Sequence, residues 1–250
     1  MPHKIIAIIP ARYASSRFPG KPLVDIAGKS MIRRVYEQVQ QCKHLNEVVV
    51  ATDDSRIFDH VRAFGGRVMM TAATHQSGTD RCAEVVAAHT GFDLAINIQG
   101  DEPFIHPDQL DLVVSCLTKP GVQIATLIKK ITASEELFNT NSPKVVVDVN
   151  GRALYFSRQA IPFQRGVPPE DWLQSHSYFK HIGIYGFRTN ILAQLTALPV
   201  SPLEGTEMLE QLRWLENGYP IQTAETTHET IGIDNPEDVE RVLKIHYGKH

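Results

Sequence analysis

The chain lacks the features that mark several classes of protein. It has only three cysteines in 250 residues, Cys42, Cys82 and Cys116, and they form no Cys-x-x-Cys pair. This odd and scattered set argues against a disulfide framework or a zinc ribbon and favours a reducing compartment. No apolar run approaches the roughly 18–20 residues of a membrane span, and the first residues carry no signal-peptide cleavage pattern. We therefore predict a cytoplasmic protein that does not insert into a membrane.

Neither sign of charge dominates the composition. Lys and Arg number 25 against 28 Asp and Glu, which gives a formal net charge of −3. Proteins that bind nucleic acid across their surface are usually far more basic, so we expect no nucleic-acid partner. Hydrophobic residues account for 42% of the chain and charged residues for 21%, fractions that are ordinary for a globular protein able to bury a full core.

Several catalytic fingerprints are missing as well. No Gly-x-Gly-x-x-Gly pattern occurs, which makes a nicotinamide dehydrogenase the least favoured function. Gly20-Lys21 is followed by Pro22 rather than Ser or Thr, so this loop is not a Walker A motif. The 11 histidines form no His-Glu-x-x-His pair, and no Gly-x-Ser-x-Gly elbow is present. Zinc-dependent and serine-hydrolase chemistry are therefore disfavoured.

The first half of the chain alternates short strands with amphipathic helices. Apolar runs that suit strands buried on both faces occur at Ile5–Ile9, Val48–Ala51 and Leu94–Ile98. Helical spacing of apolar residues predicts helices that begin after Ser30, after Asp53-Asp54-Ser55, near Thr79 and near Pro107. This alternation predicts right-handed βαβ crossovers in an open, mostly parallel α/β sheet with helices on both faces.

The second half breaks this rhythm. A hairpin with a two-residue type I′ turn is predicted at Lys144–Val149, Asn150-Gly151 and Arg152–Phe156. Alternation from Lys180 to Phe187 predicts a strand that places His181 and Tyr185 on one face. Further helices are expected over residues 191–197 and 204–217 and from Pro236 onward. We interpret this half as an insertion that completes a site and then returns to the sheet.

Positive charge is concentrated in and after the loop that follows the first strand. Between positions 12 and 34 the only acid is Asp25, and the basic residues are Arg12, Arg17, Lys21, Lys29, Arg33 and Arg34. Ligands of open α/β sheets collect at the carboxyl ends of the strands, and cations beside small residues suit a polyphosphate. Composition alone favours a polyphosphate site and a solvated basic loop equally.

Two carboxylates are candidate metal ligands. Asp101 lies in the segment Gln99–Pro103, which directly follows a predicted strand, and Asp234 lies two residues before Pro236 at a helix start. Mg²⁺ prefers one or two carboxylates together with phosphate oxygens. Taken alone, however, Asp101 also fits a tight turn and Asp234 a helix N-cap, and for each residue this structural interpretation is the stronger one.

Several blocks of sequence form a further pattern, in order along nearly the whole chain. They are Pro10-Ala11-Arg12, Ser16-Arg17, Pro19-Gly20-Lys21-Pro22-Leu23, His75-Gln76-Ser77-Gly78-Thr79, Gln99-Gly100-Asp101-Glu102-Pro103, Ala153–Arg158, His181–Phe187, Ser201–Glu204, Glu207–Arg213 and Gly232–Asp238. This pattern resembles the CMP-sugar synthetase family, in the variant typical of cytidylyltransferases for 3-deoxy-D-manno-octulosonate (KDO). One departure is Asp80, where the family more often has Glu; the carboxylate is kept.

The resemblance implies a single nucleotidyltransferase domain over residues 1–250 with a Rossmann-like, nucleotide-diphospho-sugar transferase fold. A protruding hairpin subregion, at about residues 140–190, would serve the sugar site and a homodimer interface. The implied reaction is attack of the anomeric hydroxyl of KDO on the α-phosphate of CTP. It yields CMP-KDO and pyrophosphate, requires Mg²⁺ and supplies lipopolysaccharide synthesis.

The resemblance also implies roles for individual residues. The catalytic residues would be Arg12, Lys21, Asp101 and Asp234, with Asp101 and Asp234 as the metal ligands. The nucleotide would contact Pro10, Ala11, Arg12, Arg17, Lys21, Gln76, Ser77, Gly78 and Asp101. The sugar acid would contact Gln99, Arg158, His181, Tyr185, Glu210 and Gln211. For two of the sugar-site assignments a structural alternative stays open: Arg158 could stabilise the hairpin, and one of Glu210 and Gln211 could be plain surface.

Two other functions remain to be weighed. A cytidylyltransferase for another 2-keto sugar acid, such as sialic acid or 8-amino-KDO, would share the triphosphate loop but differ in its sugar contacts. A catalytically silent nucleotide-binding protein would be expected to have lost Lys21, Asp101 or Asp234, and all three are present.

Overall fold

The computed structural model describes residues 3–14 and 18–248. Its contacts divide the chain into two compact units, one formed by residues 1–111 with 229–250 and the other by residues 112–228. The expected single domain over residues 1–250, with its subregion near 140–190, stays a prediction. Among the described residues, no helix combines the length and the apolar character that crossing a membrane requires.

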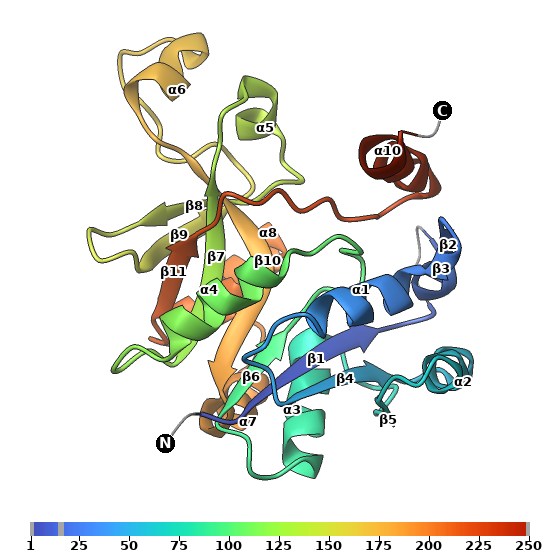
Figure 1. The fold of residues 1–250 in the computed structure, drawn as a ribbon. Helices are drawn as coiled ribbons and strands as arrows, with labels where there is room; N and C mark the ends of the chain where they lie inside the picture. Colours follow the sequence, from blue (N-terminus) through green and yellow to red (C-terminus); the bar gives the residue numbers. More distant parts are fainter. Residues whose placement is uncertain (1–2, 15–17, 249–250) are drawn as a thin grey trace. The chain divides into compact units, whose positions relative to one another are not determined.

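The first unit is built on four parallel strands, drawn in blue to green in Figure 1. Their spatial order is β6 (Leu94–Asn97), β1 (Ile5–Ala11), β4 (Glu47–Thr52) and β5 (Val68–Met70). The cores of the three predicted strands, in β1, β4 and β6, are therefore confirmed, whereas β5 was not predicted. Strand β1 is central in this group, and its Ile5–Ile9 side chains are at most 3% exposed, as expected for a strand that is covered on both faces.

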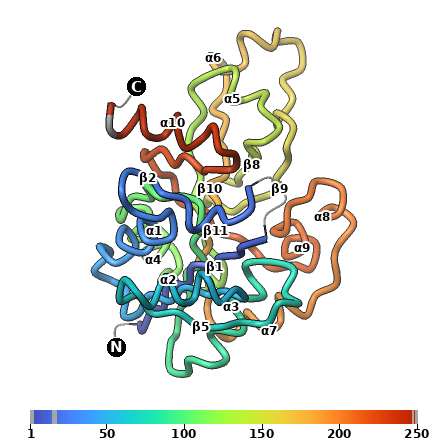
Figure 2. The backbone as a smooth tube through the Cα atoms, turned by 90° about the vertical axis from the view of Figure 1, so that its right-hand side faces the viewer, coloured from blue at the N-terminus to red at the C-terminus, as the bar shows by residue number. Residues whose placement is uncertain are grey.

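The helices of this unit begin where the sequence predicts. They are α1 (Met31–Val39), α2 (Ser55–Ala63) and α3 (Gly78–Ala88). Their N-cap side chains, Ser30, Asp54 and Ser77, each accept a hydrogen bond from a main-chain N–H of the first turn. Figures 1 and 2 show α1 and α3 on opposite faces of the four strands. The α/β character predicted for this half is confirmed.

The basic loop and the C-terminal helix lie together in the same unit. The loop contains the short 3₁₀ helix η1 (Lys21–Leu23) and leads into the small hairpin β2 (Asp25–Ile26) and β3 (Lys29–Ser30); the last helix is α10 (Pro236–Tyr247). Buried Ile26 and Met31 pack with Ile233 and Val242 in one apolar cluster. This packing fixes the start of α10 against the loop that precedes α1.

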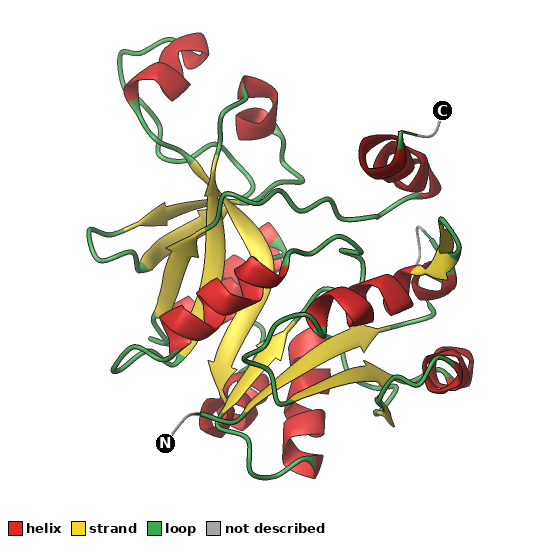
Figure 3. Cartoon of the chain, in the orientation of Figure 1, coloured by secondary structure: helices red, strands yellow, loops and turns green. Residues whose placement is uncertain are grey.

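The second unit contains strands of both orientations, as Figure 3 shows. Strand β7 (Ile124–Lys130) pairs antiparallel with β10 (Phe179–Arg188) and parallel with β11 (Ile221–Glu225). Strand β8 (Lys144–Val147) pairs antiparallel with β10 and with β9 (Ala153–Ser157). Helix α4 (Pro107–Leu117) leads from the first unit into the second, and Pro107 occupies the predicted first-turn position.

The remaining helices of the second unit are short. They are α5 (Ser134–Phe138), η2 (Pro169–Asp171), α6 (Trp172–Ser175), α7 (Thr189–Ala197), α8 (Pro202–Glu207) and α9 (Gln211–Glu216). Helix α7 confirms the prediction for residues 191–197. The single helix expected over residues 204–217 is wrong, because Met208 adopts a left-handed conformation with φ 53° and ends α8. Apolar spacing alone did not reveal this break.

The turn between β8 and β9 also differs from the prediction. A type I′ turn needs positive φ at both central residues, but of the pair Asn150-Gly151 only Gly151 has it, with φ 73°. The strands pair from Val147 to Ala153, so the connection is longer than two residues. Its shape is held by the Asp148 carboxylate, which accepts hydrogen bonds of 2.8 Å from the main-chain N–H groups of Asn150 and Arg152.

Strand β10 is interrupted by a bulge that its sequence pattern did not predict. Ile182 pairs with Leu127 and Tyr185 with Thr126, so two residues of β10 have no counterpart on β7. An insertion of two residues preserves the alternation of faces. His181 and Tyr185 therefore still share a face, as predicted, with ring centroids 5.2 Å apart.

Close packing against β10 generates a first prediction. A Cβ added at Gly186 would lie 2.6 Å from Cγ1 of Val113 and 3.1 Å from Cδ2 of Leu117, both on α4. We expect Gly186→Ala to lower the free energy of unfolding by about 1–3 kcal/mol through overpacking. The matched control is Gly205→Ala in α8, where nothing lies within 4 Å of the added carbon. Urea denaturation of both variants measures the difference, and equal stabilities would contradict the prediction.

Candidate active site

A hollow of about 430 Å³ opens at the carboxyl ends of β1 and β6, within the first unit. It lies where ligands of open α/β sheets usually bind. Its lining brings together the basic loop, the segment after β6 and the segment that precedes α10. The lining residues are Pro10, Ala11, Arg12, Ala14, Lys21, Pro22, Gln99, Gly100, Asp101 and Asp234.

Lys21, Asp101 and Asp234 converge in this hollow although up to 213 positions separate them in the sequence. The Nζ atom of Lys21 lies 2.7 Å from Oδ2 of Asp101 and 3.6 Å from Oδ1 of Asp234. The Lys21 side chain is 15% exposed, against 29% for Asp101 and 52% for Asp234. The two carboxylates therefore face one ammonium group from two different segments of the chain.

Main-chain contacts fix the two acidic segments to each other. The N–H of Ile233 donates to the carbonyl oxygen of Asp101 at 3.0 Å. A Cβ at Gly100 would lie 2.7 Å from the carbonyl oxygen of Pro10, so only glycine allows this close approach to the end of β1. Asp101 is thereby held beside the first strand, as its position after a strand predicted.

Asp234 is oriented by the start of α10. The carboxylate of Asp238 accepts hydrogen bonds from the main-chain N–H groups of Asp234, at 2.9 Å, and of Asn235, at 3.0 Å. The cap of this helix is therefore Asn235, in a capping box with Asp238. The N-cap role that the sequence favoured for Asp234 is wrong by one residue. The Asp234 carboxylate instead reaches Lys21.

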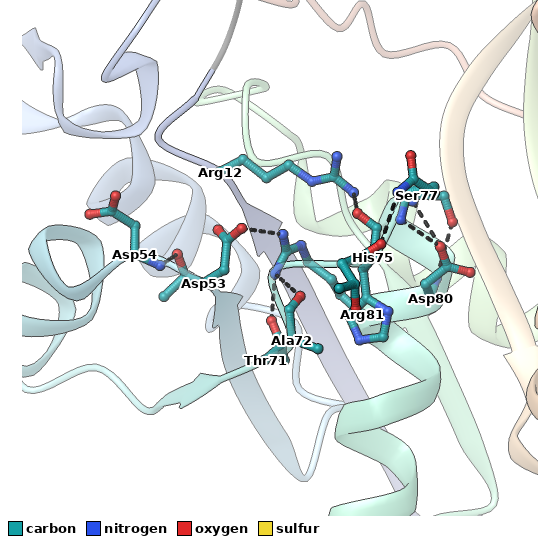
Figure 4. A network of polar contacts seen from close by, with 12 residues as sticks. Arg12, Asp53, Asp54, Thr71, Ala72, His75, Ser77, Asp80 and Arg81 are labelled. Atoms are coloured by element: carbon teal, nitrogen blue, oxygen red, sulfur yellow. Dashed lines mark hydrogen bonds and ion pairs between the residues drawn. The ribbon is translucent and has the colours of Figure 1, made fainter.

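Arg12 extends from the end of β1 toward a network of polar side chains (Figure 4). Its Nη2 donates to the main-chain carbonyl of His75 at 2.8 Å. Burial and the nearby positive charge of Arg81 lower the pKa of Arg12, whereas Asp53 and Asp80 act to raise it. A guanidinium stays charged despite such shifts, so Arg12 presents a positive group beside the 75–78 turn.

Sequence reasoning missed the residues at the centre of this network. The Arg81 side chain is fully buried and donates to Oγ1 of Thr71 at 2.6 Å, and its Nη2 lies 2.9 Å from Oδ2 of Asp53 (Figure 4). A charged residue on the buried side of α3, next to Cys82, was one available signal. The position of Asp53 directly after β4, where site residues collect, was another.

The turn predicted to contact the nucleotide base is shaped by Asp80. Its carboxylate accepts from the main-chain N–H groups of Gln76, at 3.0 Å, and Ser77, at 2.9 Å. Gly78 approaches Pro10, because a Cβ there would lie 3.3 Å from the proline ring. The structure thus brings this turn and the end of β1 together. Arg17, which was also assigned to the nucleotide, lies outside the described residues.

His181 and Tyr185 form an aromatic cluster in the second unit. Nε2 of His181 lies 2.9 Å from the Thr126 hydroxyl, and burial lowers the pKa of His181 to about 3. Burial also raises the pKa of Tyr185 well above its ordinary value, with a smaller contribution from Glu210. Tyr185 packs edge-on against Trp214, with ring centroids 5.1 Å apart. Both site residues are therefore neutral near pH 7.

Three buried polar atoms of the second unit have no hydrogen-bond partner. They are the Tyr185 hydroxyl, Nε2 of Gln211 and Nε1 of Trp214. Such groups are rare in folded proteins, because an unpaired buried donor costs about 1–3 kcal/mol. Two of the three belong to residues that the sequence assigned to the sugar acid. Trp214 was not predicted, and an aromatic side chain on a helix gave no signal of a polar role.

Arg158 is occupied by contacts within the protein. Its Nε donates to the carbonyl oxygen of Glu207 at 2.7 Å, Nη1 to that of Thr140 at 3.2 Å and Nη2 to that of Met208 at 3.3 Å. The Glu207 carboxylate in turn accepts from the main-chain N–H of Arg158 at 2.9 Å. Arg158 thus holds the break between α8 and α9, and these three side-chain contacts lie outside the hairpin that the structural alternative named.

The other predicted sugar contacts differ in their burial and in the unit to which they belong. Gln99, in the first unit, lines the hollow described above, while Glu210 directly precedes α9 in the second. Gln211 is 5% exposed and Glu210 is only partly buried, so neither side chain is plain surface.

Comparison with known proteins identifies the family to which the chain is similar. Residues 6–231 match the cytidylyltransferase family. The 3-deoxy-manno-octulosonate cytidylyltransferase of Parabacteroides distasonis is 55% identical over 245 residues, which cover 96% of this chain and 97% of the relative. The relative of the same name in Cytophaga hutchinsonii is 58% identical over 240 residues, covering 95% and 96%.

A solved structure is similar over the same extent. It is CMP:2-keto-3-deoxy-manno-octonic acid synthetase complexed with CTP, at 43% identity and a TM-score of 0.90, with 97% of this chain and 98% of that chain covered. This likeness confirms the predicted α/β fold of nucleotide-diphospho-sugar transferases. On the family match and the identity to these relatives, the chain belongs to the cytidylyltransferase family.

Proposed function

We propose that this protein transfers the cytidylyl group of CTP to the anomeric hydroxyl of KDO, giving CMP-KDO and pyrophosphate for lipopolysaccharide synthesis. Near full-length relatives named for KDO and a similar structure complexed with CTP support the assignment. The observation that carries it is the meeting of Lys21, Asp101 and Asp234 at the carboxyl ends of β1 and β6. That arrangement suits a triphosphate and a divalent cation.

Cations of the first loop would bind the triphosphate. Arg12 and Lys21 line the same hollow and supply positive charge there. Charge develops on the pyrophosphate as the bond to the α-phosphate breaks, and fixed cations stabilise that charge. We assign the stabilisation of the departing pyrophosphate to Arg12 and Lys21. The resemblance to the CMP-sugar synthetase family adds Arg17 to this set.

Two carboxylates facing one cation are a donor set that fits Mg²⁺, which prefers oxygen ligands. Asp101 and Asp234 would hold the ion. When bound, Mg²⁺ supplies Lewis-acid polarisation of the phosphate and charge neutralisation. Pro10 and Ala11 at the end of β1, with the Gln76-Ser77-Gly78 turn, would contact the cytidine; the Asp80 contacts hold that turn in shape.

The second unit would supply contacts to the sugar acid. Tyr185 and Gln211 present buried polar atoms without partners, which the hydroxyl groups of a polyol can satisfy. Burial lowers the pKa of His181 and makes its ring a weak base, so His181 suits a hydrogen bond to a sugar hydroxyl rather than proton abstraction. Glu210 and Gln99 complete the proposed set of hydroxyl partners, and Arg158 keeps the α8–α9 segment in place. We also propose a homodimer, as the resemblance implies.

The direct test is pyrophosphate release from nucleoside triphosphates in the presence of candidate sugar acids. We expect release that requires CTP, KDO and Mg²⁺ together, with other triphosphates at least tenfold slower in kcat/KM because the base contacts differ. Sialic acid and 8-amino-KDO are the informative competitors. Preference for either of them over KDO would overturn the substrate assignment.

Asp101→Asn tests the proposed metal ligand. The amide keeps the size of the side chain but removes its charge, so we expect kcat to fall by two orders of magnitude or more, because the lost interaction acts in the transition state. Thermal unfolding should change little. The control is Asp59→Asn on the exposed side of α2. Near-normal turnover of Asp101→Asn at saturating Mg²⁺ would contradict the role.

Tyr185→Phe separates a sugar contact from a structural role. Because the Tyr185 hydroxyl is buried without a partner, we expect its removal to leave the free energy of unfolding unchanged or higher. The KM for KDO should rise about tenfold, the equivalent of one lost hydrogen bond, whereas the KM for CTP should stay constant. Steady-state kinetics with either substrate varied, together with urea denaturation, measure both effects. Lower stability with an unchanged KM for KDO would assign Tyr185 to the core alone.

A further inference from the structure

The ammonium group of Lys21 lies where the two candidate metal ligands converge. It is 2.7 Å from the Asp101 carboxylate and 3.6 Å from that of Asp234. At 15% exposure of the Lys21 side chain, water screens these contacts less than it would at an open surface. A divalent cation that binds the same two carboxylates therefore meets a positive charge at close range.

The carboxylates do not depend on Lys21 to remain together. The hydrogen bond from Ile233 N–H to the Asp101 carbonyl joins their segments through the main chain. Asp238 independently fixes the backbone at Asp234, and the apolar cluster of Ile26, Met31, Ile233 and Val242 anchors α10. Replacing Lys21 by an uncharged residue should thus leave the two carboxylates in place without the ammonium group of Lys21 beside them.

We propose that Lys21 is an internal competitor that keeps a free divalent ion out of this site until the nucleotide arrives. Triphosphate oxygens offer the ammonium group a second set of anionic partners. A metal–nucleotide complex can therefore draw Lys21 away from the carboxylates while it delivers the ion with further oxygen ligands. The metal enters with the nucleotide rather than before it. This inference rests on the proposed function for the identities of the ion and the nucleotide.

The test is a titration of nucleotide-free protein with Mn²⁺ alone. The electron paramagnetic resonance signal of the free ion measures how much Mn²⁺ is bound. Removing one positive charge next to two carboxylates should tighten binding, and we expect the Kd of Lys21→Met to fall about tenfold or more. Lys21→Arg keeps the charge and should bind as weakly as the unmodified protein. Lys21→Gln also removes the charge but keeps a polar side chain. Measuring both variants means that the result does not depend on the folding of one of them.

A double variant, Lys21→Met with Asp101→Asn, checks that the tighter Mn²⁺ binding occurs at this site. We expect the second substitution to abolish the increase in Mn²⁺ affinity. Unchanged or weaker Mn²⁺ binding by folded Lys21→Met or Lys21→Gln would overturn the proposal, as would a gain that survives in the double variant. The experiment uses neither CTP nor sugar and measures no turnover. Failure of the proposed reaction, seen as absent pyrophosphate release, is therefore distinguishable from failure of this inference.

Discussion

The mutual repulsion of negative charges is the constraint on which this structure depends. Asp101 and Asp234 repel each other, and the ammonium group of Lys21, which lies beside both, offsets that repulsion. The proposed reaction adds a triphosphate and a sugar acid, which are anions as well. Fixed positive groups must then be in position before the reactants meet, because a cation that had to move in during the reaction would lose part of its stabilising effect to reorganisation.

Backbone geometry, rather than side-chain contacts alone, brings these charges together. Gly100 lets the segment after β6 touch the end of β1, and the main chain of Ile233 ties α10 to the same segment. Arg12 is held by the main-chain carbonyl of His75, and Arg81 joins the segment after β5, through Thr71, to Asp53 after β4. Each charged group therefore sits on a segment whose position does not depend on the charge that it carries.

The sequence predicts the regular elements better than the irregular ones. Buried strands such as β1, the helix cap at Ser30 and the start of a helix near Thr79 depend on local patterns, so they could be predicted. The left-handed break at Met208 could not, because carbonyl contacts from Arg158, 50 positions away, hold it. The candidate residues Asp101 and Asp234 were identified, but only the fold could show that they share Lys21, and the burial of Arg81 depends equally on tertiary contacts.

The second unit shows a different balance between stability and binding. Arg158 donates to three main-chain carbonyls, so it contributes to the fold. Tyr185 and Gln211 are buried without partners, so they cost stability in the protein alone. A ligand rich in hydroxyl groups would remove that cost on binding. Packing gains nothing from these unpaired polar atoms, so their burial supports the proposed contacts with a polyol.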